Sequence, residues 1–212
     1  MKVIAFLSQV EELDEIYCYC SNPLVKEYLT DRVQFLQRST DLDTPVARRN
    51  DILRAFLSEI KTDLLVLSHV TSPFLKAETV SKCVSMVESG EYDSALAAVK
   101  LQEFLWLDGK SYNFDSANMP RSQELPKIYK ETCGCLVLHA DQFLETGNYV
   151  GVKPFVCEVG EIESIDIDYQ EDFDIANAIY MTLFARRGGG IKFAILHCAG
   201  AHSVALDESE AA

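Results

Sequence analysis

The stretch that decides the fold is LLVLSHVTSPF, residues 64–74. Its first four residues form a continuous apolar run, which is typical of a strand covered on both faces. The polar residues that follow, His69 and Thr71-Ser72, come directly after the carboxyl end of that strand, where open α/β sheets bind their ligands. The stretch therefore predicts one strand of a covered sheet with a candidate site beside it.

Strand and helix patterns alternate outward from this stretch. Strand patterns occupy residues 16–20, 33–36, 94–99, 133–138 and 153–156, and helical periodicity occupies residues 24–29, 50–60, 77–87 and 172–183. Alternation of this kind indicates a mostly parallel sheet with helices on both faces. We therefore expect one α/β domain over residues 1–184, followed by a tail, residues 185–212, that shows no periodic pattern.

Both ends of this domain depart from the usual α/β pattern. Residues 1–13 resemble the end of a helix leading into the strand at 16–20, and no glycine occurs before Gly90. Phosphate-binding loops usually follow the first strand and rely on glycine. We therefore expect the first strand and its phosphate loop to be lacking. Arg186-Arg187 and Gly188–Gly190 read as a linker, with phosphate contact as the alternative.

The composition narrows the class of partner. A formal net charge of −14 argues against nucleic acid, because phosphate neutralisation needs a basic stripe. A nucleotide substrate remains compatible with this charge, provided that a few local cations and a divalent metal hold its phosphates. No apolar run approaches the roughly 20 residues that span a bilayer, and no secretory signal is recognisable. We expect a cytoplasmic protein.

The seven cysteines read as buried apolar side chains in a reducing compartment. Cys18 and Cys20, like Cys133 and Cys135, are two residues apart, which places each pair on one face of a strand. The alternative is a zinc site, although its usual C-x₂₋₄-C spacing is missing. Four histidines would be available for it: His69, His139, His197 and His202.

The acidic motif near the end of the domain indicates a metal site. On an extended segment, Asp166 and Asp168 share one face, and Ile165 and Ile167 share the other. Two carboxylates can hold Mg²⁺ while leaving positions open for water and substrate phosphates. The alternative is a solvated acidic segment, since the chain has 33 acidic residues.

Other polar residues have both a functional and a structural interpretation. Arg121 can bind a carboxylate with two hydrogen bonds, or form a salt bridge within its loop. The pair Thr71-Ser72 offers hydroxyl and N–H donors, or caps the helix at 77–87. His69 can donate to a ligand or be a satisfied, half-buried histidine. Arg48-Arg49 can face a nucleotide or solvent.

Taken together, these segments resemble the acylneuraminate cytidylyltransferases, a family that includes the CMP-sialic acid synthetases. The resemblance runs from Leu13 to Tyr180. Its motifs are Leu-Asp-Glu-Ile-Tyr-x-Tyr-x-Ser at 13–21, Arg-x-x-x-Leu-Asp at 38–43, His-x-Thr-Ser-Pro-Phe at 69–74, Tyr-Asp-Ser-Ala at 92–95, Pro-Arg-x-Gln-x-Leu-Pro at 120–126, Gly134, and Glu-Ser-Ile-Asp-Ile-Asp-x-x-x-Asp-Phe at 163–173.

The resemblance implies a Rossmann-like nucleotide-diphospho-sugar transferase fold and transfer of CMP from CTP to an acidic nine-carbon sugar, with Mg²⁺ as cofactor. It implies Mg²⁺ ligands at Asp166 and Asp168, and a catalytic role for both and for Arg121. Arg121 would bind the sugar carboxylate, beside Gln123. The nucleotide-binding pocket would be lined by Arg38, Ala47, Arg48, His69, Thr71 and Ser72. Family members are commonly homodimers, in which an excursion around residues 106–126 reaches the neighbouring subunit.

This sequence also departs from the family. His69 stands where the family usually has glutamine, Cys133 replaces the asparagine before Gly134, and nothing before Leu13 matches the phosphate loop. Three hypotheses follow. The chain is a truncated or divergent cytidylyltransferase of weak or lost activity, a non-catalytic sugar- or nucleotide-binding remnant, or a product without a selected function.

Overall fold

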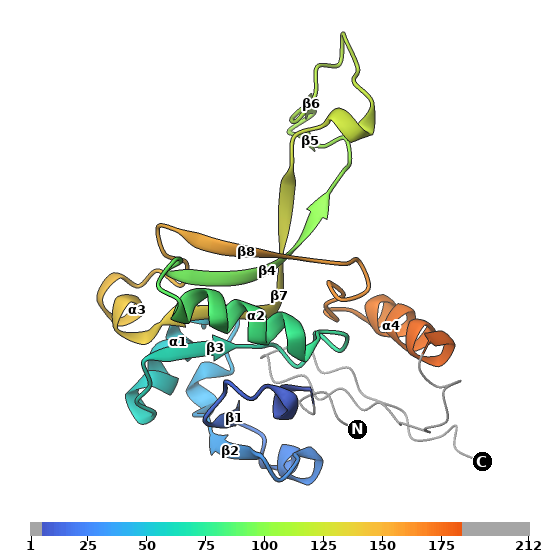
Figure 1. The fold of residues 1–212 in the computed structure, drawn as a ribbon. Coiled ribbons are helices and arrows are strands. Elements are labelled where there is room, and N and C mark those ends of the chain that lie inside the picture. The colour runs from blue at the N-terminus through green and yellow to red at the C-terminus, as the bar shows by residue number, and fades with distance from the viewer. Residues whose placement is uncertain (1–5, 184–212) are drawn as a thin grey trace, which may run out of the picture.

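The structure, a computed structural model, describes residues 6–183 (Figure 1). Its strands are β1 (Ile16–Cys20), β2 (Val33–Gln37), β3 (Leu64–Leu67), β4 (Ser94–Leu101), β5 (Trp106–Leu107), β6 (Lys110–Ser111), β7 (Ile128–His139) and β8 (Pro154–Val159). Its α-helices are α1 (Arg49–Glu59), α2 (Ala77–Glu88), α3 (Ala140–Thr146) and α4 (Gln170–Leu183), and its 3₁₀ helices are η1 (Leu7–Gln9), η2 (Pro23–Tyr28), η3 (Thr40–Leu42) and η4 (Ser122–Glu124). The expected tail, with Arg186-Arg187 and Gly188–Gly190, lies outside the described residues.

The predicted α/β fold with helices on both faces is confirmed, but its central sheet is mixed rather than mostly parallel, because two of its three strand pairings are antiparallel. Four strands lie in the order β3-β7-β4-β8. Strand β7 is antiparallel to both β3 and β4, whereas β4 and β8 are parallel. Strands β3, β4 and β8 therefore run in one direction, and β7 runs against them between β3 and β4. The carboxyl ends of β3 and β8 consequently lie at the same end of the sheet. The turn after β3 and the segment after β8 both begin there.

Helices cover both faces of this sheet. On one face, the apolar side of α2 packs on β4, β7 and β8 through Val80, Cys83, Val84, Val87, Ala95, Ala97, Cys135, Val137, Cys157 and Val159. On the other face, α1 and α3 pack on β3 and β7 through Leu53, Leu57, Leu65, Leu136, Leu138, Ala140 and Phe143. Because alternate residues of β7 point to opposite faces, this strand contributes to both cores.

Strands β1 and β2 form a separate parallel pair. Alternate β1 residues, Ile16, Cys18 and Cys20, are buried in a small core with Val33, as the period of two predicts. The intervening Tyr17 and Tyr19 make edge contacts with Phe56 of α1, at ring-centroid distances of 5.7 and 5.4 Å. Side-chain packing rather than strand pairing therefore connects β1 to the rest of the domain.

The structure contains elements that the sequence analysis missed. The helix expected at 24–29 is the 3₁₀ helix η2, where Asn22 accepts a hydrogen bond from the N–H of Leu24 and Pro23 occupies the first turn. Helix α3 was not predicted; Gly147, at φ 73°, ends it in the left-handed conformation that glycine favours. Strands β5 and β6 form a hairpin with Asp108 and Gly109, both of positive φ, at its turn.

This hairpin belongs to an arm, residues 102–127, that projects from the sheet between the end of β4 and the start of β7 (Figure 1). Edge contacts of Phe114 with Phe104 and Trp106 hold it together, at ring-centroid distances of 4.9 and 5.4 Å. The arm has its own aromatic cluster and is attached to the body through two strands. Among residues 6–183, no helix has the length and apolar character needed to cross a membrane.

The α3 core offers a stability test. Phe143 is fully buried, whereas its neighbour Leu144 is 42% exposed. We expect Phe143→Ala to lower the free energy of unfolding by about 3–5 kcal/mol, because it removes buried area and leaves a cavity. Leu144→Ala should cost less than about 1 kcal/mol. Urea denaturation measures both, and equal losses would contradict this packing.

Candidate functional site

The turn after β3 is the first wall of the candidate site. Hydrogen bonds from the N–H of Ser72 to the carbonyl of His69, and from the N–H of Leu75 to the carbonyl of Ser72, fold it tightly, at 3.2 and 3.4 Å. Thr71 and Ser72 are buried. Helix α2 begins after Lys76 without a side-chain cap. The alternative that the Thr71-Ser72 pair caps this helix is therefore wrong.

The segment after β8 is the second wall, and Glu163 anchors it to α2. This buried carboxylate accepts hydrogen bonds from the Thr79 hydroxyl and, at 3.2 Å, from the N–H of Lys76. Its other oxygen lies 2.8 Å from the Lys76 ammonium group. Because a buried charge is costly unless it is paired and hydrogen-bonded, these contacts fix the position of the segment.

A main-chain hydrogen bond joins the two walls. The N–H of Ile167 donates to the carbonyl of Thr71 at 2.9 Å. The Ile167 side chain is buried with Phe74 and with Ala176 of α4. Ile165 packs against the same cluster, as the expected alternation of this motif requires. The aspartates on either side of Ile167 are therefore held beside the turn after β3.

Strand β7 is the third wall, and its middle is irregular. The register with β4 shifts between the pair Leu96–Leu136 and the pair Ala98–Glu131. Cys135 remains in the α2 core, but Cys133 is only half-buried and lies 3.5 Å from the Arg49 guanidinium of α1. The prediction that Cys133 is a buried apolar residue on the face of Cys135 is therefore wrong, because the irregularity interrupts the alternation.

At Gly134 this distorted strand lies close to the turn. A Cβ built on Gly134 would lie 3.4 Å from side-chain atoms of Ser72 and of Leu75. This distance is ordinary van der Waals contact, so an alanine Cβ would still fit there. Gly134 therefore lies directly against the turn that carries His69.

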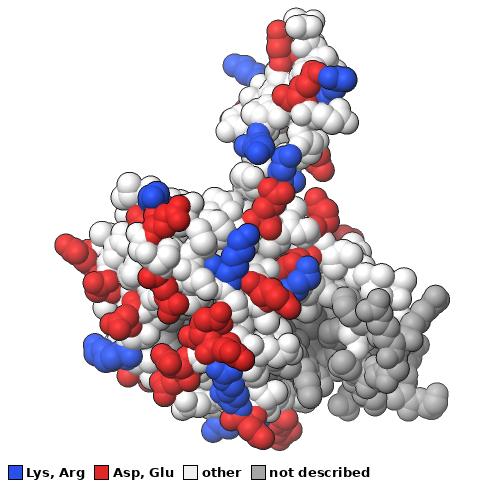
Figure 2. Space-filling model, in the orientation of Figure 1, with Lys and Arg blue, Asp and Glu red and all other residues white. Residues whose placement is uncertain are grey.

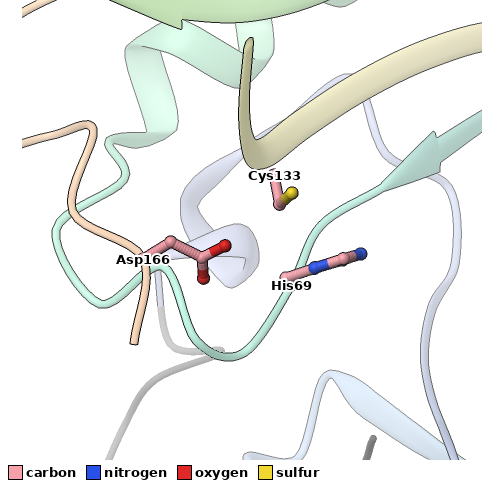
Figure 3. Close-up of side chains that lie close together, drawn as sticks. All are labelled: His69, Cys133 and Asp166. Atoms are coloured by element: carbon pink, nitrogen blue, oxygen red, sulfur yellow. The ribbon is translucent and has the colours of Figure 1, made fainter. Parts of the chain in front are cut away.

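These three walls bring His69, Cys133 and Asp166 together (Figure 3). One possible ligand atom from each residue lies within 4.8 Å of the others. All three side chains are half-buried, and Asp166 Oδ1 is inaccessible to solvent and has no hydrogen-bond partner among the described residues. Asp168 is exposed, and its N–H and that of Tyr169 donate to the carboxylate of Asp172 at the start of α4.

Burial and the neighbouring charges shift the pKa values of His69 and Cys133 in opposite directions. Burial, and next the nearby Arg49 cation, lower the pKa of His69 from its ordinary value, against the opposing effect of Asp166 and Asp168. Burial and Asp166 raise the pKa of the Cys133 thiol, while Arg49 opposes them. Both carboxylates of the Asp-x-Asp motif thus act on His69.

Arg49 is the principal cation of this site. Its guanidinium lies 3.0 Å from the Glu131 carboxylate and stacks over the Tyr149 ring at 4.8 Å from the centroid. The sequence leaves open whether Arg49 faces a nucleotide or solvent, and it gives no signal for Glu131. Arg49 of α1 and Glu131 of β7 both belong to the site. They are too far apart in the sequence for a local motif to connect them.

The remaining predicted nucleotide residues belong to the segment between the end of β2 and the start of α1. Arg38 is buried and pairs with Asp43 at 2.7 Å. Ala47 is half-buried, and Arg48 is exposed and precedes the first turn of α1. The N–H of Arg48 donates to the Asp51 carboxylate at 2.8 Å, which stabilises that first turn.

The predicted sugar residues lie on the arm. Arg121 is 81% exposed and pairs with Glu124 at 2.5 Å, as its salt-bridge interpretation expected, and Gln123 is exposed. On the face shown in Figure 2, acidic and basic side chains are interspersed over the body and the arm. Among residues 6–183, no hydrogen bond or ion pair joins Arg121 or Gln123 to the cluster of His69, Cys133 and Asp166.

Comparison with known proteins identifies the fold. No protein-family model matches the chain, and no curated protein matches it significantly. The 4-diphosphocytidyl-2C-methyl-D-erythritol synthase of Anaerococcus prevotii superimposes with a TM-score of 0.60 at 17% identity, over 84% of this chain and 87% of that one. The chain has the α/β nucleotidyltransferase fold.

Two further structures share this fold. The 2-C-methyl-D-erythritol 4-phosphate cytidylyltransferase of Francisella tularensis matches with a TM-score of 0.54 at 13% identity, over 83% of this chain and 86% of that one. A CMP:2-keto-3-deoxy-manno-octonic acid synthetase complexed with CTP matches with a TM-score of 0.57 at 12% identity, over 84% and 86%. The fold is thus that of cytidylyltransferases with different substrates.

The effect of Arg49 on His69 can be measured. We expect Arg49→Gln to raise the pKa of His69, because the variant removes a nearby positive charge that opposes protonation. Arg54→Gln, on the same helix but directed at Phe143 and Leu144, should leave it unchanged. Histidine NMR titrations of the protein in a chelating buffer report both values. An unchanged His69 pKa in Arg49→Gln would contradict this electrostatic coupling.

Proposed function

We propose that this chain is a cytidylyltransferase-type protein that binds CTP and an acidic nine-carbon sugar, sialic acid or a related nonulosonic acid. It would transfer CMP to the sugar and release pyrophosphate. The observation that carries the proposal is the position of Asp166, held beside the Thr71-Ser72 turn by the bond between Ile167 and Thr71. Support also comes from the shared fold, one solved example of which is complexed with CTP.

A magnesium ion fits the carboxylates that the proposal assigns to it. Asp166 Oδ1 is buried without a hydrogen-bond partner in the described chain, and Asp168 is exposed on the same short segment. Mg²⁺ prefers such oxygen ligands and retains several waters. When bound, it would neutralise phosphate charge and orient the transferred group.

The nucleotide would bind along the turn after β3. The buried Ser72 hydroxyl has no hydrogen-bond partner among the described residues, so it is available to donate to a ligand oxygen. Thr71 and His69 belong to the same turn. Arg38, Ala47 and Arg48 would complete the nucleotide side. In a chain of net charge −14, these few cations and the metal must supply the attraction for a triphosphate.

The sugar would bind Arg121 and Gln123, and we propose that they act across a cytoplasmic homodimer. Arg121 donates from Nε and from one terminal nitrogen to a single Glu124 oxygen, and it would exchange this exposed partner for the sugar carboxylate, which can accept two parallel hydrogen bonds. Support for the dimer comes from the large apolar side chains that the arm exposes: Trp106, Leu107, Tyr112 and Met119.

A non-catalytic role is the second candidate. One observation favours it: the pair β1-β2 is not hydrogen-bonded to the four-stranded sheet in the described chain. A remnant of this kind would retain a sugar or nucleotide site without transferring CMP. Pyrophosphate release with CTP, Mg²⁺ and a panel of nonulosonic acids separates the two candidates, because only a transferase releases it.

Calorimetry with CTP and Mg²⁺ tests the nucleotide site. We expect Asp168→Asn to weaken Mg²⁺-dependent CTP binding by at least about tenfold, because it removes a charge-assisted contact with the metal. Asp174→Asn, on the exposed side of α4, is the matched control and should bind normally. If the wild-type protein is folded and binds neither CTP nor a nonulosonic acid, the proposed function is wrong.

A further inference from the structure

The cluster of His69, Cys133 and Asp166 offers three different donor types at one point. The imidazole comes from the turn after β3, the thiol from β7 and the carboxylate from the segment after β8 (Figure 3). Their ligand atoms lie within 4.8 Å of one another. These three segments are far apart in the sequence, so the tertiary structure alone brings the donors together.

The identity of these donors points away from magnesium. Mg²⁺ is bound through oxygen, whereas zinc takes cysteine sulfur, histidine nitrogen and carboxylate oxygen in one tetrahedral site. We propose that His69, Cys133 and Asp166 form a three-ligand site for a zinc ion. The fourth position would remain open to water or to a ligand atom, as it does in zinc sites that bind exchangeable groups.

An unsatisfied polar atom supports the site independently. Asp166 Oδ1 is buried and lacks a hydrogen-bond partner among residues 6–183. A buried carboxylate oxygen without a partner costs free energy, which a bound cation would recover. The bond between Ile167 and Thr71 and the contacts of Glu163 with α2 fix the backbone next to this oxygen. The backbone position of Asp166 is therefore fixed by contacts that do not involve a metal.

The surrounding charges suit a divalent cation. Arg49 lies next to Cys133, but it is paired with Glu131 at 3.0 Å and directed toward the Tyr149 ring. Asp168 adds a further carboxylate that acts on His69. The carboxylates of Asp166, Asp168 and Glu131 outnumber Arg49, the single cation among these groups. The local field therefore attracts a positive ion.

This inference goes beyond the proposed function, because zinc binding requires neither CTP nor sugar. The two proposals share Asp166 and are separated by the other ligands. Asp168 belongs to the magnesium proposal alone, and Cys133 belongs to the zinc proposal alone. Variants of these two residues therefore distinguish the failure of one proposal from the failure of the other.

Cobalt titration of the full chain tests the site, because Co²⁺ occupies zinc sites and a bound thiolate gives it a near-ultraviolet charge-transfer band. We expect chelator-treated protein in excess Mg²⁺ to take up one Co²⁺ with this band, and added Zn²⁺ to displace it. Cys133→Ser should abolish the band. His69→Gln and Asp166→Asn should each lower the Co²⁺ affinity by at least about tenfold.

Matched controls make the result specific. Cys135→Ala, two residues along β7, and His139→Gln, at the end of the same strand, should keep the band and the affinity. Asp168→Asn should keep the thiolate band, because Asp168 is not one of the three ligands, and should lower the Co²⁺ affinity far less than His69→Gln does. Cys133→Asp provides a second variant if Cys133→Ser does not fold, and it should bind Co²⁺ without the thiolate band. Absence of the band in folded wild-type protein, or its persistence in Cys133→Ser, would overturn the proposal.

Discussion

The irregularity in the middle of β7 is the constraint on which the rest of the site depends. This strand lies between β3 and β4 and packs against helices on both faces, so its regular part is fixed by two ladders and two cores. Where its register with β4 shifts, the Thr132 hydroxyl donates to the Ala97 carbonyl at 3.2 Å, which satisfies a buried acceptor at the distortion. The shift frees Cys133 from the core while Cys135 stays in it. Gly134 of the strand lies directly against Ser72 and Leu75.

The other two walls of the site, the turn after β3 and the segment after β8, are held in place by both polar and apolar interactions. Glu163 is fixed to α2 by an ion pair and two hydrogen bonds, and Ile167 is fixed to the turn after β3 by a main-chain bond and by burial. Asp166 lies between these two anchors. The backbone of Asp166 is therefore held beside the turn after β3, and this places its carboxylate next to His69 and Cys133.

Much of the fold could be predicted from the sequence, because hydrophobic periodicity reports local burial directly. The runs at 16–20, 64–67 and 94–99 became strands, and the helical patterns at 50–60, 77–87 and 172–183 became α1, α2 and α4. The hairpin of the arm was missed although Asp108-Gly109 is a turn signal. Helix α3 was missed because it is short. The separation of β1-β2 from the main sheet has no local signature, since strand pairing depends on which edges meet.

The sequence by itself determined which segments are apolar, which residues could hold a metal, and that Asp166 and Asp168 alternate with Ile165 and Ile167. Only the tertiary structure decided that His69 and Cys133, rather than a cysteine pair, accompany Asp166. The C-x-C spacing of Cys133 and Cys135 predicted a shared face, and the shift in β7 separated them. The physical reason is that periodicity describes a regular strand, whereas the neighbours of a side chain depend on the register of every strand around it. A register shift leaves no trace in the order of the residues.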